Sequence, residues 1–387
     1  MTALVPTKPA GRLPALSALR SVLLLMGVFG HAAMVLPLFD PRATATDVLL
    51  LKASYQLVHI WRVPTYFLIS GFLSAALFAR GSIWDFVRGR FKRVTSVLLA
   101  AQLFIIPVFA LSPGGCDVCQ PFGGSTWLAV GWLHLWFLYD LVIISHLFVA
   151  GIWVKRRLPR GVQERLSSLA SMFSIGPVSL LGLAAVCTLV PGVFGPGNLL
   201  RINFGILPDP WLILYHSIFF TAGWLLRRNA GLASPPRNLW LLVAAAIALT
   251  FVTYSSMGPD GLIETYLANL TSWVSAWAVI CCFMSLVTKP NRVWNYLNDA
   301  SYWVYLWHAI PVLLLSWSFA HLGLNVWLNL VATSAITLAL TLGTYTRWVA
   351  ETVIGLYLSG RRRNRVNSAS SLNSRTQAIP TGGPLTE

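Results

Sequence analysis

Residues 16–38 read LSALRSVLLLMGVFGHAAMVLPL, and this apolar stretch decides the fold. It is as long as a helix that crosses a lipid bilayer. Only two of its side chains are strongly polar, Arg20 and His31. At about 100° per residue, their spacing brings both to nearly the same helix face, roughly 16 Å apart along the axis. Ionisable groups inside a membrane helix are costly, so this face is a candidate functional site.

The composition indicates an all-α integral membrane protein. Of the 387 residues, 56% are hydrophobic and 10% are charged, whereas soluble domains carry about 25% charged residues. Apolar runs of about 20 residues recur along the chain and predict about ten transmembrane helices. We expect these spans at residues 16–38, 54–79, 94–112, 131–153, 173–191, 211–226, 238–256, 265–287, 300–319 and 324–346.

The basic residues predict the topology. The formal net charge is +16, but Lys and Arg lie in short clusters between the apolar runs. This pattern follows the positive-inside rule and does not indicate a nucleic-acid partner. With the N-terminus in the cytoplasm, the outer side holds only four of the 28 basic residues, namely Arg42, Lys52, Arg62 and Arg201. We therefore expect both termini in the cytoplasm.

Two segments lie outside the predicted membrane domain of residues 14–352, and one loop within it carries a cysteine pair. Residues 1–13 are expected to form a cytoplasmic N-terminal segment. Residues 364–387 are rich in Ser, Asn, Thr, Pro and Gly and predict a disordered cytoplasmic tail. Cys116 and Cys119 form a CxxC pair in a Gly-rich outer loop. A single CxxC is a weak zinc signal, so we expect no metal and, in an oxidising compartment, a local disulfide.

The second and fourth spans carry further ionisable residues. His59 and Arg62 are three residues apart and share a face. Arg62 either extends to the outer interface or lines, with His59, the outer half of a cavity. His134 and Asp140 are six apart, which places them on different faces. Asp140 lies deep enough to need a partner: it orients a histidine, pairs with an arginine or hydrogen-bonds within the bundle.

The ninth span contains Tyr305 and His308, three residues apart on one face. A lone histidine in such a helix is often a satisfied hydrogen-bonding residue. A tyrosine and a histidine together are better candidates for a pocket wall. Pro311 follows and is expected to bend the helix.

The residue types suggest transfer chemistry with a phosphorylated donor. The sequence contains no P-loop, dinucleotide fingerprint, HExxH or GxSxG motif. Histidine is the usual general base near neutral pH, and without an adjacent nucleophile direct transfer to a hydroxyl is the simpler route. Arg20 suits a phosphate, and a donor with a long thin arm such as coenzyme A fits its separation from His31. In the plainer alternative, Arg20 anchors the inner interface and His31 bridges helices.

Four segments, in order, resemble the membrane acyltransferase family 3. The first is the pair formed by Arg20 and His31. The others are HIWRVPTYFLISGFLSAALFAR (59–80), HLWFLYDLV (134–142) and ASYWVYLWHAIPV (300–312). Within the family, their wording resembles the glucans biosynthesis protein C group, in which the acyl group is succinyl and the acceptor is a periplasmic glucan. The resemblance covers residues 14–352.

The resemblance implies an acyl-CoA-dependent O-acyltransferase that passes several times through the bacterial inner membrane. It would move a succinyl or acetyl group from cytoplasmic acyl-CoA, a substrate and not a resident cofactor, to an extracytoplasmic carbohydrate hydroxyl. His31 and Arg20 take the family's paired catalytic roles, with Arg20 also holding the donor. The predicted substrate-binding residues are Arg62, His59, His134, Tyr305, His308 and Asp140. Asp140 departs from the glucan group, where an apolar residue is expected.

Two other functions remain open at this point. Within the enzyme class, the acceptor is alternatively another envelope glycan or a glycolipid. Outside it, the buried His and Arg residues would serve a non-catalytic transporter or flippase of an envelope precursor. The sequence shows no internal repeat of the kind common in transporters, which argues weakly against that alternative.

Overall fold

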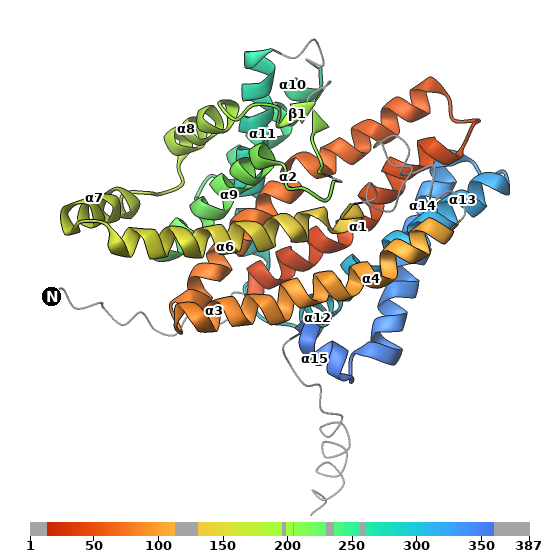
Figure 1. Cartoon of the computed structure of the whole chain (residues 1–387). Coiled ribbons are helices and arrows are strands. Elements are labelled where there is room, and N and C mark those ends of the chain that lie inside the picture. The colour runs from red at the N-terminus through yellow and green to blue at the C-terminus, as the bar shows by residue number, and fades with distance from the viewer. Residues whose placement is uncertain are drawn as a thin grey trace, which may run out of the picture.

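The structure is a computed structural model that describes residues 14–112, 131–195, 199–203, 205–229, 236–255 and 261–359. These residues are overwhelmingly helical, which confirms the predicted all-α class (Figure 1). The strands in these ranges are β1 (Phe194–Gly195) and β2 (Leu199–Leu200), which pair antiparallel with Phe194 opposite Leu200. Residues 1–13, the pair Cys116 and Cys119, and the predicted tail lie outside the described residues.

The helices follow one another through the chain with few interruptions. In order they are α1 (Pro14–Phe39), α2 (Ala45–Phe78), α3 (Ile83–Arg90), the π-helical turn η1 (Phe91–Thr95), α4 (Ser96–Leu111), the short 3-10 turn η3 (Leu133–Leu135), α6 (Trp136–Arg157), α7 (Arg160–Ser171), α8 (Pro177–Thr188), α9 (Pro210–Arg228), α10 (Leu239–Ser255), α11 (Leu262–Leu286), α12 (Arg292–Trp307), α13 (Ala309–His321), α14 (Val326–Thr344), the π-helical turn η5 (Tyr345–Val349) and α15 (Val353–Ser359).

Each of the ten predicted spans contains a helix, but not all meet the length of a membrane crossing. Within the described ranges, six segments are long and apolar enough, namely Pro14–Phe39, Ala45–Phe78, Ile83–Leu111, Leu133–Arg157, Leu262–Leu286 and Val326–Val349. The bent pair α12 and α13 makes a seventh if it is one span, and α8 and α10 are shorter apolar helices. The all-α membrane class is therefore supported, while the count of ten and the placement of the termini stay predictions.

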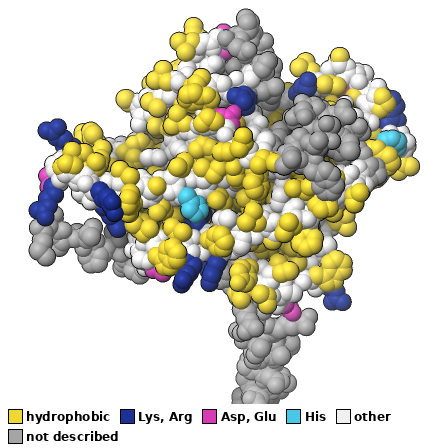
Figure 2. Space-filling view, viewed as in Figure 1, with side chains coloured by type: hydrophobic (Ala, Val, Ile, Leu, Met, Phe, Trp, Pro, Cys, Tyr) yellow, Lys and Arg dark blue, Asp and Glu magenta, His cyan; other side chains and the backbone are white. Residues whose placement is uncertain are grey.

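Helix α1 is the centre of the bundle. It packs against α2, α11, α12, α13 and α14. More than half of its most apolar window is buried inside the protein. In contrast, apolar side chains spread widely over the outer face that Figure 2 shows, as expected for a surface that meets lipid hydrocarbon. The polar groups of α1 therefore face protein on nearly all sides.

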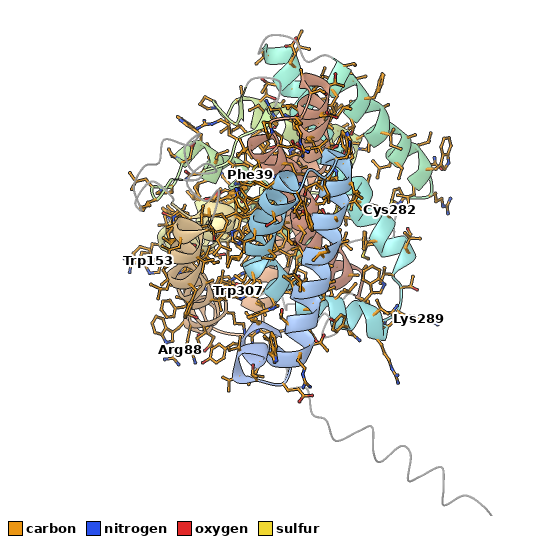
Figure 3. The ribbon with its side chains drawn as sticks, turned by 90° about the vertical axis from the view of Figure 1, so that its right-hand side faces the viewer. Phe39, Arg88, Trp153, Cys282, Lys289 and Trp307 are labelled. Atoms are coloured by element: carbon orange, nitrogen blue, oxygen red, sulfur yellow. The ribbon has the colours of Figure 1, made fainter. Side chains whose placement is uncertain are left out.

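The basic loops gather at one end of the bundle. Figure 3 shows Phe39, the last residue of α1, in the upper part of the view and Arg88 and Lys289 in the lower part. Arg88 lies in α3 and Lys289 lies between α11 and α12, two segments that the charge pattern assigns to the same side of the membrane. Their common position agrees with the predicted topology.

Close backbone contact joins α2 to α9, the pair with the most extensive packing in the bundle. A Cβ added at Gly71 would collide with the backbone carbonyl of Phe220, and one at Gly223 with that of Leu68. Small residues allow two membrane helices to approach in this way, because lipid supplies no hydrophobic force to hold them together. The contact fixes α2, which carries His59 and Arg62.

The ninth predicted span is broken into two helices. Helix α12 ends at Trp307, α13 starts at Ala309, and their axes differ by 60°. Pro311 explains this break, because it lacks an N–H group and its ring excludes the carbonyl of the residue four positions earlier, Trp307. The predicted bend is thus confirmed, and His308 occupies the junction itself.

We predict that Gly71→Ala destabilises the protein by about 1–3 kcal/mol, because its new methyl group forces α2 and α9 apart. Gly151→Ala is the matched control, since a Cβ there meets nothing within 4 Å and alanine favours the helix. Thermal unfolding of detergent-purified protein should show a lower midpoint for Gly71→Ala alone. Equal midpoints for the two variants would contradict the close-packing account.

Candidate active site

Arg20 and His31 face the same neighbour, as their spacing predicts. Nη2 of Arg20 donates to Oδ1 of Asn298 on α12, at 2.8 Å. Nδ1 of His31 lies 2.9 Å from Nε2 of His308 at the end of that helix. The pair therefore defines a line along the interface of α1 and α12.

Backbone carbonyls determine the tautomer of His308. Its Nδ1 lies 3.0 Å from the carbonyl oxygen of Val304 and 2.8 Å from that of Tyr305. A carbonyl oxygen only accepts hydrogen bonds, so Nδ1 carries the proton and Nε2 of the neutral ring keeps a lone pair. These carbonyls belong to the last turn of α12, and that of Val304 also accepts the backbone N–H of His308 at 2.9 Å.

The same reasoning assigns the basic nitrogen of His31. Its Nδ1 lies 2.7 Å from the carbonyl oxygen of Gly27 and 2.9 Å from Nε2 of His308, which carries a lone pair. Both neighbours accept, so Nδ1 of His31 carries the hydrogen and Nε2 is the basic atom. Among the described residues, Nε2 of His31 has no hydrogen-bond partner. It is thus free to take a proton from a substrate.

His134 completes a cluster of three imidazoles. Its ring centre lies 5.1 Å from that of His308 and 6.1 Å from that of His31. Nε2 of His134 donates to the carbonyl of Leu306 at 3.0 Å, and the hydroxyl of Tyr305 donates to the carbonyl of His134 at 2.8 Å. One bond uses a backbone carbonyl next to the break and the other uses the backbone of η3, so η3 is held against the end of α12.

Arg62, on α2, lies against the turn of α1 that precedes His31. Its Nη1 would be 3.0 Å from a Cβ at Gly27 and 3.9 Å from one at Gly30. Only 8% of the residue is exposed. The structure therefore places Arg62 inside the bundle. Of the two positions predicted for it, the one at the outer interface is not observed.

His59 lies near Arg62 on α2 but makes different contacts. Its ring stacks on Tyr55, with ring centres 4.8 Å apart, and approaches Trp136 at 6.0 Å. Nε2 of His59 and the hydroxyl of Tyr55 are buried without a hydrogen-bond partner in the part of the chain that the structure describes. These groups form a buried polar cluster between α2 and α6.

Asp140 pairs with a histidine that the sequence reasoning missed. Its Oδ2 lies 3.1 Å from Nδ1 of His216 on α9, and both side chains are buried. Of the three roles expected for Asp140, the structure shows the first, in which the carboxylate orients a histidine. The face of Phe67 stacks on His216 at 4.3 Å. The signal was available, because His216 is an ionisable residue inside the predicted span 211–226.

A large basic cavity opens beside Arg20. Its volume is about 630 Å³, and it lies between α1, α2, α3, α6 and α12, within the size range of small-molecule sites. Six cations line it, opposed by the single carboxylate of Asp85: Arg20, Arg80, Arg88, Arg90, Lys92 and Arg93. Asp85 is already engaged, because it caps α3 through Ser82. The cavity therefore has a strong preference for an anion.

A second, small cavity lies deeper in the bundle. Its volume is about 10 Å³, enough for roughly one water molecule. Arg62, Phe137 and Tyr305 line it, and Leu24 and Tyr66 line both this cavity and the large one. The two cavities are thus neighbours across a thin wall, with the cations on one side and Arg62 on the other.

The structure separates the predicted site residues into four groups. His31, His134, Tyr305 and His308 form one cluster; Arg62 and His59 lie beside it on α2; Arg20 belongs to the large cavity. Asp140 belongs to a separate pair with His216. No group of His, Cys, Asp or Glu in the described ranges could hold a metal ion. The arrangement offers a general base next to a buried cation and, further along α1, an anion site.

Comparisons with known proteins identify the family of this chain. A family model described as an acyltransferase domain, of the acyltransferase family 3, matches residues 13–346. The Glucans biosynthesis protein C of Shigella dysenteriae serotype 1 (strain Sd197) is 25% identical over 332 residues, covering 78% of this chain and 82% of that protein. The protein of the same name from Escherichia coli (strain SMS-3-5 / SECEC) has the same values, and that of Escherichia coli O139:H28 is 24% identical. No solved structure matches at the threshold that these relatives pass.

We predict that breaking the buried pair of Asp140 and His216 costs about 3–5 kcal/mol, because the remaining partner is left uncompensated in an apolar interior. His216→Phe tests this, and the double variant Asp140→Leu with His216→Phe should recover most of the loss. Chemical unfolding of the purified protein measures both. Additive losses in the double variant would show that the two residues do not stabilise each other.

Proposed function

Because this chain belongs to the acyltransferase family 3, as its motifs predict, we propose that it is a membrane O-acyltransferase with an acyl-CoA donor and an extracytoplasmic carbohydrate acceptor. The acyl group of this proposal is succinyl or acetyl. The observation that carries the proposal is the adjacency of the basic cavity to the small cavity lined by Arg62, across Leu24 and Tyr66. Arg62 in turn lies against Gly27, whose carbonyl accepts the hydrogen bond of His31.

The basic cavity suits the nucleotide end of the donor. Coenzyme A carries phosphates, and guanidinium groups bind phosphate through paired hydrogen bonds. Tyr302 supports this wall, because its hydroxyl donates to the carbonyl of Arg93 at 3.3 Å. Arg90 contacts the hydroxyl of Ser74 on α2. The cations therefore sit on a braced wall, and the thin pantetheine arm would extend from it along α1 toward His31.

The histidine cluster suits transfer of the acyl group without a covalent enzyme intermediate. Nε2 of His31 takes the proton of the acceptor hydroxyl as its oxygen attacks the thioester carbonyl carbon. The carbon–sulfur bond then breaks, and the departing sulfur receives the proton from His31. An ester and free coenzyme A result, so atoms and charge balance. His308 accepts the hydrogen bond from Nδ1 of His31 and stabilises the imidazolium that forms between the two steps.

The names of the relatives and the charge pattern bear on the acceptor and on the membrane. The relatives are named for glucan biosynthesis, which favours a periplasmic glucan over another envelope glycan or a glycolipid. The charge pattern and the common end of the basic loops favour a multi-pass protein of the bacterial inner membrane. The transporter alternative loses its support, because the chain belongs to a family of acyltransferases.

The direct test uses purified protein in lipid nanodiscs with acyl-CoA that is radiolabelled in its acyl group. Succinyl-CoA and acetyl-CoA are compared as donors, and a periplasmic glucan is compared with other envelope glycans. Label bound covalently to the glucan supports the proposal. Uptake or release of glycan without any covalent label would favour a transporter.

We predict that His31→Ala abolishes transfer while the protein stays folded, because no other described group can take the proton at the same point. The control is His321→Ala, which removes an exposed histidine at the end of α13. The initial rate of labelled product measures both variants. A His31→Ala protein with wild-type rate would eliminate the base assignment.

We predict that Arg20→Lys raises the KM for acyl-CoA by about 10-fold or more, since a lysine loses the two-pronged phosphate contact. The matched control is a donor, S-acyl pantetheine, which lacks the nucleotide phosphates. With this donor the substitution should leave KM unchanged. An equal rise with both donors would show that Arg20 does not act on phosphate.

A further inference from the structure

Arg62 is a buried cation without a counter-ion among the described residues. Only 8% of it is exposed. In the ranges covered by the structure, no ion pair or hydrogen bond engages its guanidinium group. The buried carboxylates of Asp40 and Asp140, in contrast, each have a partner. An uncompensated charge in an apolar interior is destabilising by several kcal/mol, so its presence calls for a ligand or a function.

The position of Arg62 narrows the identity of that ligand. The guanidinium lies against Gly27, whose carbonyl accepts the hydrogen bond of His31. It therefore lies within about one helical turn of the proposed base. Arg62 lines the small cavity and does not line the large one. The phosphates of the donor have six cations of their own, so they do not need Arg62.

Glycine at position 27 makes room for this arrangement. A methyl group there would press on Nη1 of Arg62 at 3.0 Å, closer than ordinary van der Waals contact. The side chain of Arg62 is thus accommodated directly on the backbone of α1. This places its positive charge at the point where the donor arm, passing Leu24 and Tyr66, would bring the thioester.

We propose that Arg62 is a catalytic residue that binds the oxyanion of the tetrahedral intermediate. This inference rests on the proposed acyl transfer. When the acceptor oxygen bonds to the thioester carbon, the electron pair of the carbonyl bond moves to its oxygen, which becomes negative. The guanidinium N–H groups donate to that oxygen until the carbon–sulfur bond breaks and the carbonyl forms again. A cation fixed in a water-poor site is effective here because it needs no reorganisation when the charge develops.

The proposal implies opposite effects on stability and on rate. If the charge of Arg62 serves the transition state, its removal relieves a buried, unpaired cation and raises the melting temperature. The same removal lowers kcat, by about 10²- to 10³-fold for loss of an oxyanion donor. The KM for the donor should change less than about 3-fold, because the interaction forms only during reaction. If Arg62 only stabilised the fold, its removal would lower the melting temperature of the protein.

The experiment compares Arg62→Met, Arg62→Lys and a paired arginine, Arg42→Met, in purified protein. Arg42 forms an ion pair with Asp40 at 2.9 Å and bonds the carbonyl of Ala320. For Arg42→Met we expect a lower melting temperature and an unchanged kcat. For Arg62→Met we expect the reverse pattern, and for Arg62→Lys, which retains the charge, an intermediate kcat. Both succinyl-CoA and acetyl-CoA serve as donors.

Three results would overturn the proposal. A lower melting temperature or failure to fold in Arg62→Met would make the residue structural. An unchanged kcat would show that the charge does not serve the reaction. A loss confined to succinyl-CoA would show that Arg62 binds the free carboxylate of the acyl group and not the oxyanion. The wild-type control separates these from failure of the proposed function, since in that case neither donor is used by any protein tested.

Discussion

The hydrogen bond between His31 and His308 is the contact on which the site depends. It joins the central helix α1 to the junction of α12 and α13 at 2.9 Å. Pro311 breaks the helix there, and two carbonyls in the last turn of α12 fix the tautomer of His308. That tautomer in turn leaves the Nε2 atom of His31 as the basic nitrogen. Hydrogen bonds to the backbone thus define the tautomers of both histidines.

The second constraint is the cost of burying charged side chains inside an apolar bundle. Asp140 and His216 are buried together and compensate each other. Arg62 is buried near His31 with no ion-pair partner among the described residues, and six other cations line the large cavity. This distribution orders the molecule along α1, with an anion site at Arg20, a buried cation near Gly27 and the histidines beyond. It matches the direction in which a long phosphorylated donor would lie.

Much of this order could be predicted from the sequence, and the reasons are local. The spacing of Arg20 and His31 determines a common face, and Pro311 determines a bend. The partners of these residues could not be predicted from the sequence, because contacts such as that of His31 with His308 join positions far apart in the chain. His216 carried the same signal as the other intramembrane histidines. Arg88 and Arg90 were interpreted only as topology signals, and their role as a cavity wall depends on how α3 and η1 fold back against α2 and α6.

The central claim is that one donor molecule spans both cavities along α1. A structure of the protein in nanodiscs with a non-hydrolysable acyl-CoA analogue, determined by electron cryomicroscopy, measures this most directly. The account predicts nucleotide phosphates among Arg20, Arg88 and Arg90, and the carbonyl of the acyl group between Arg62 and His31. Phosphates bound elsewhere, or an acyl group that stops short of Leu24 and Tyr66, would contradict it.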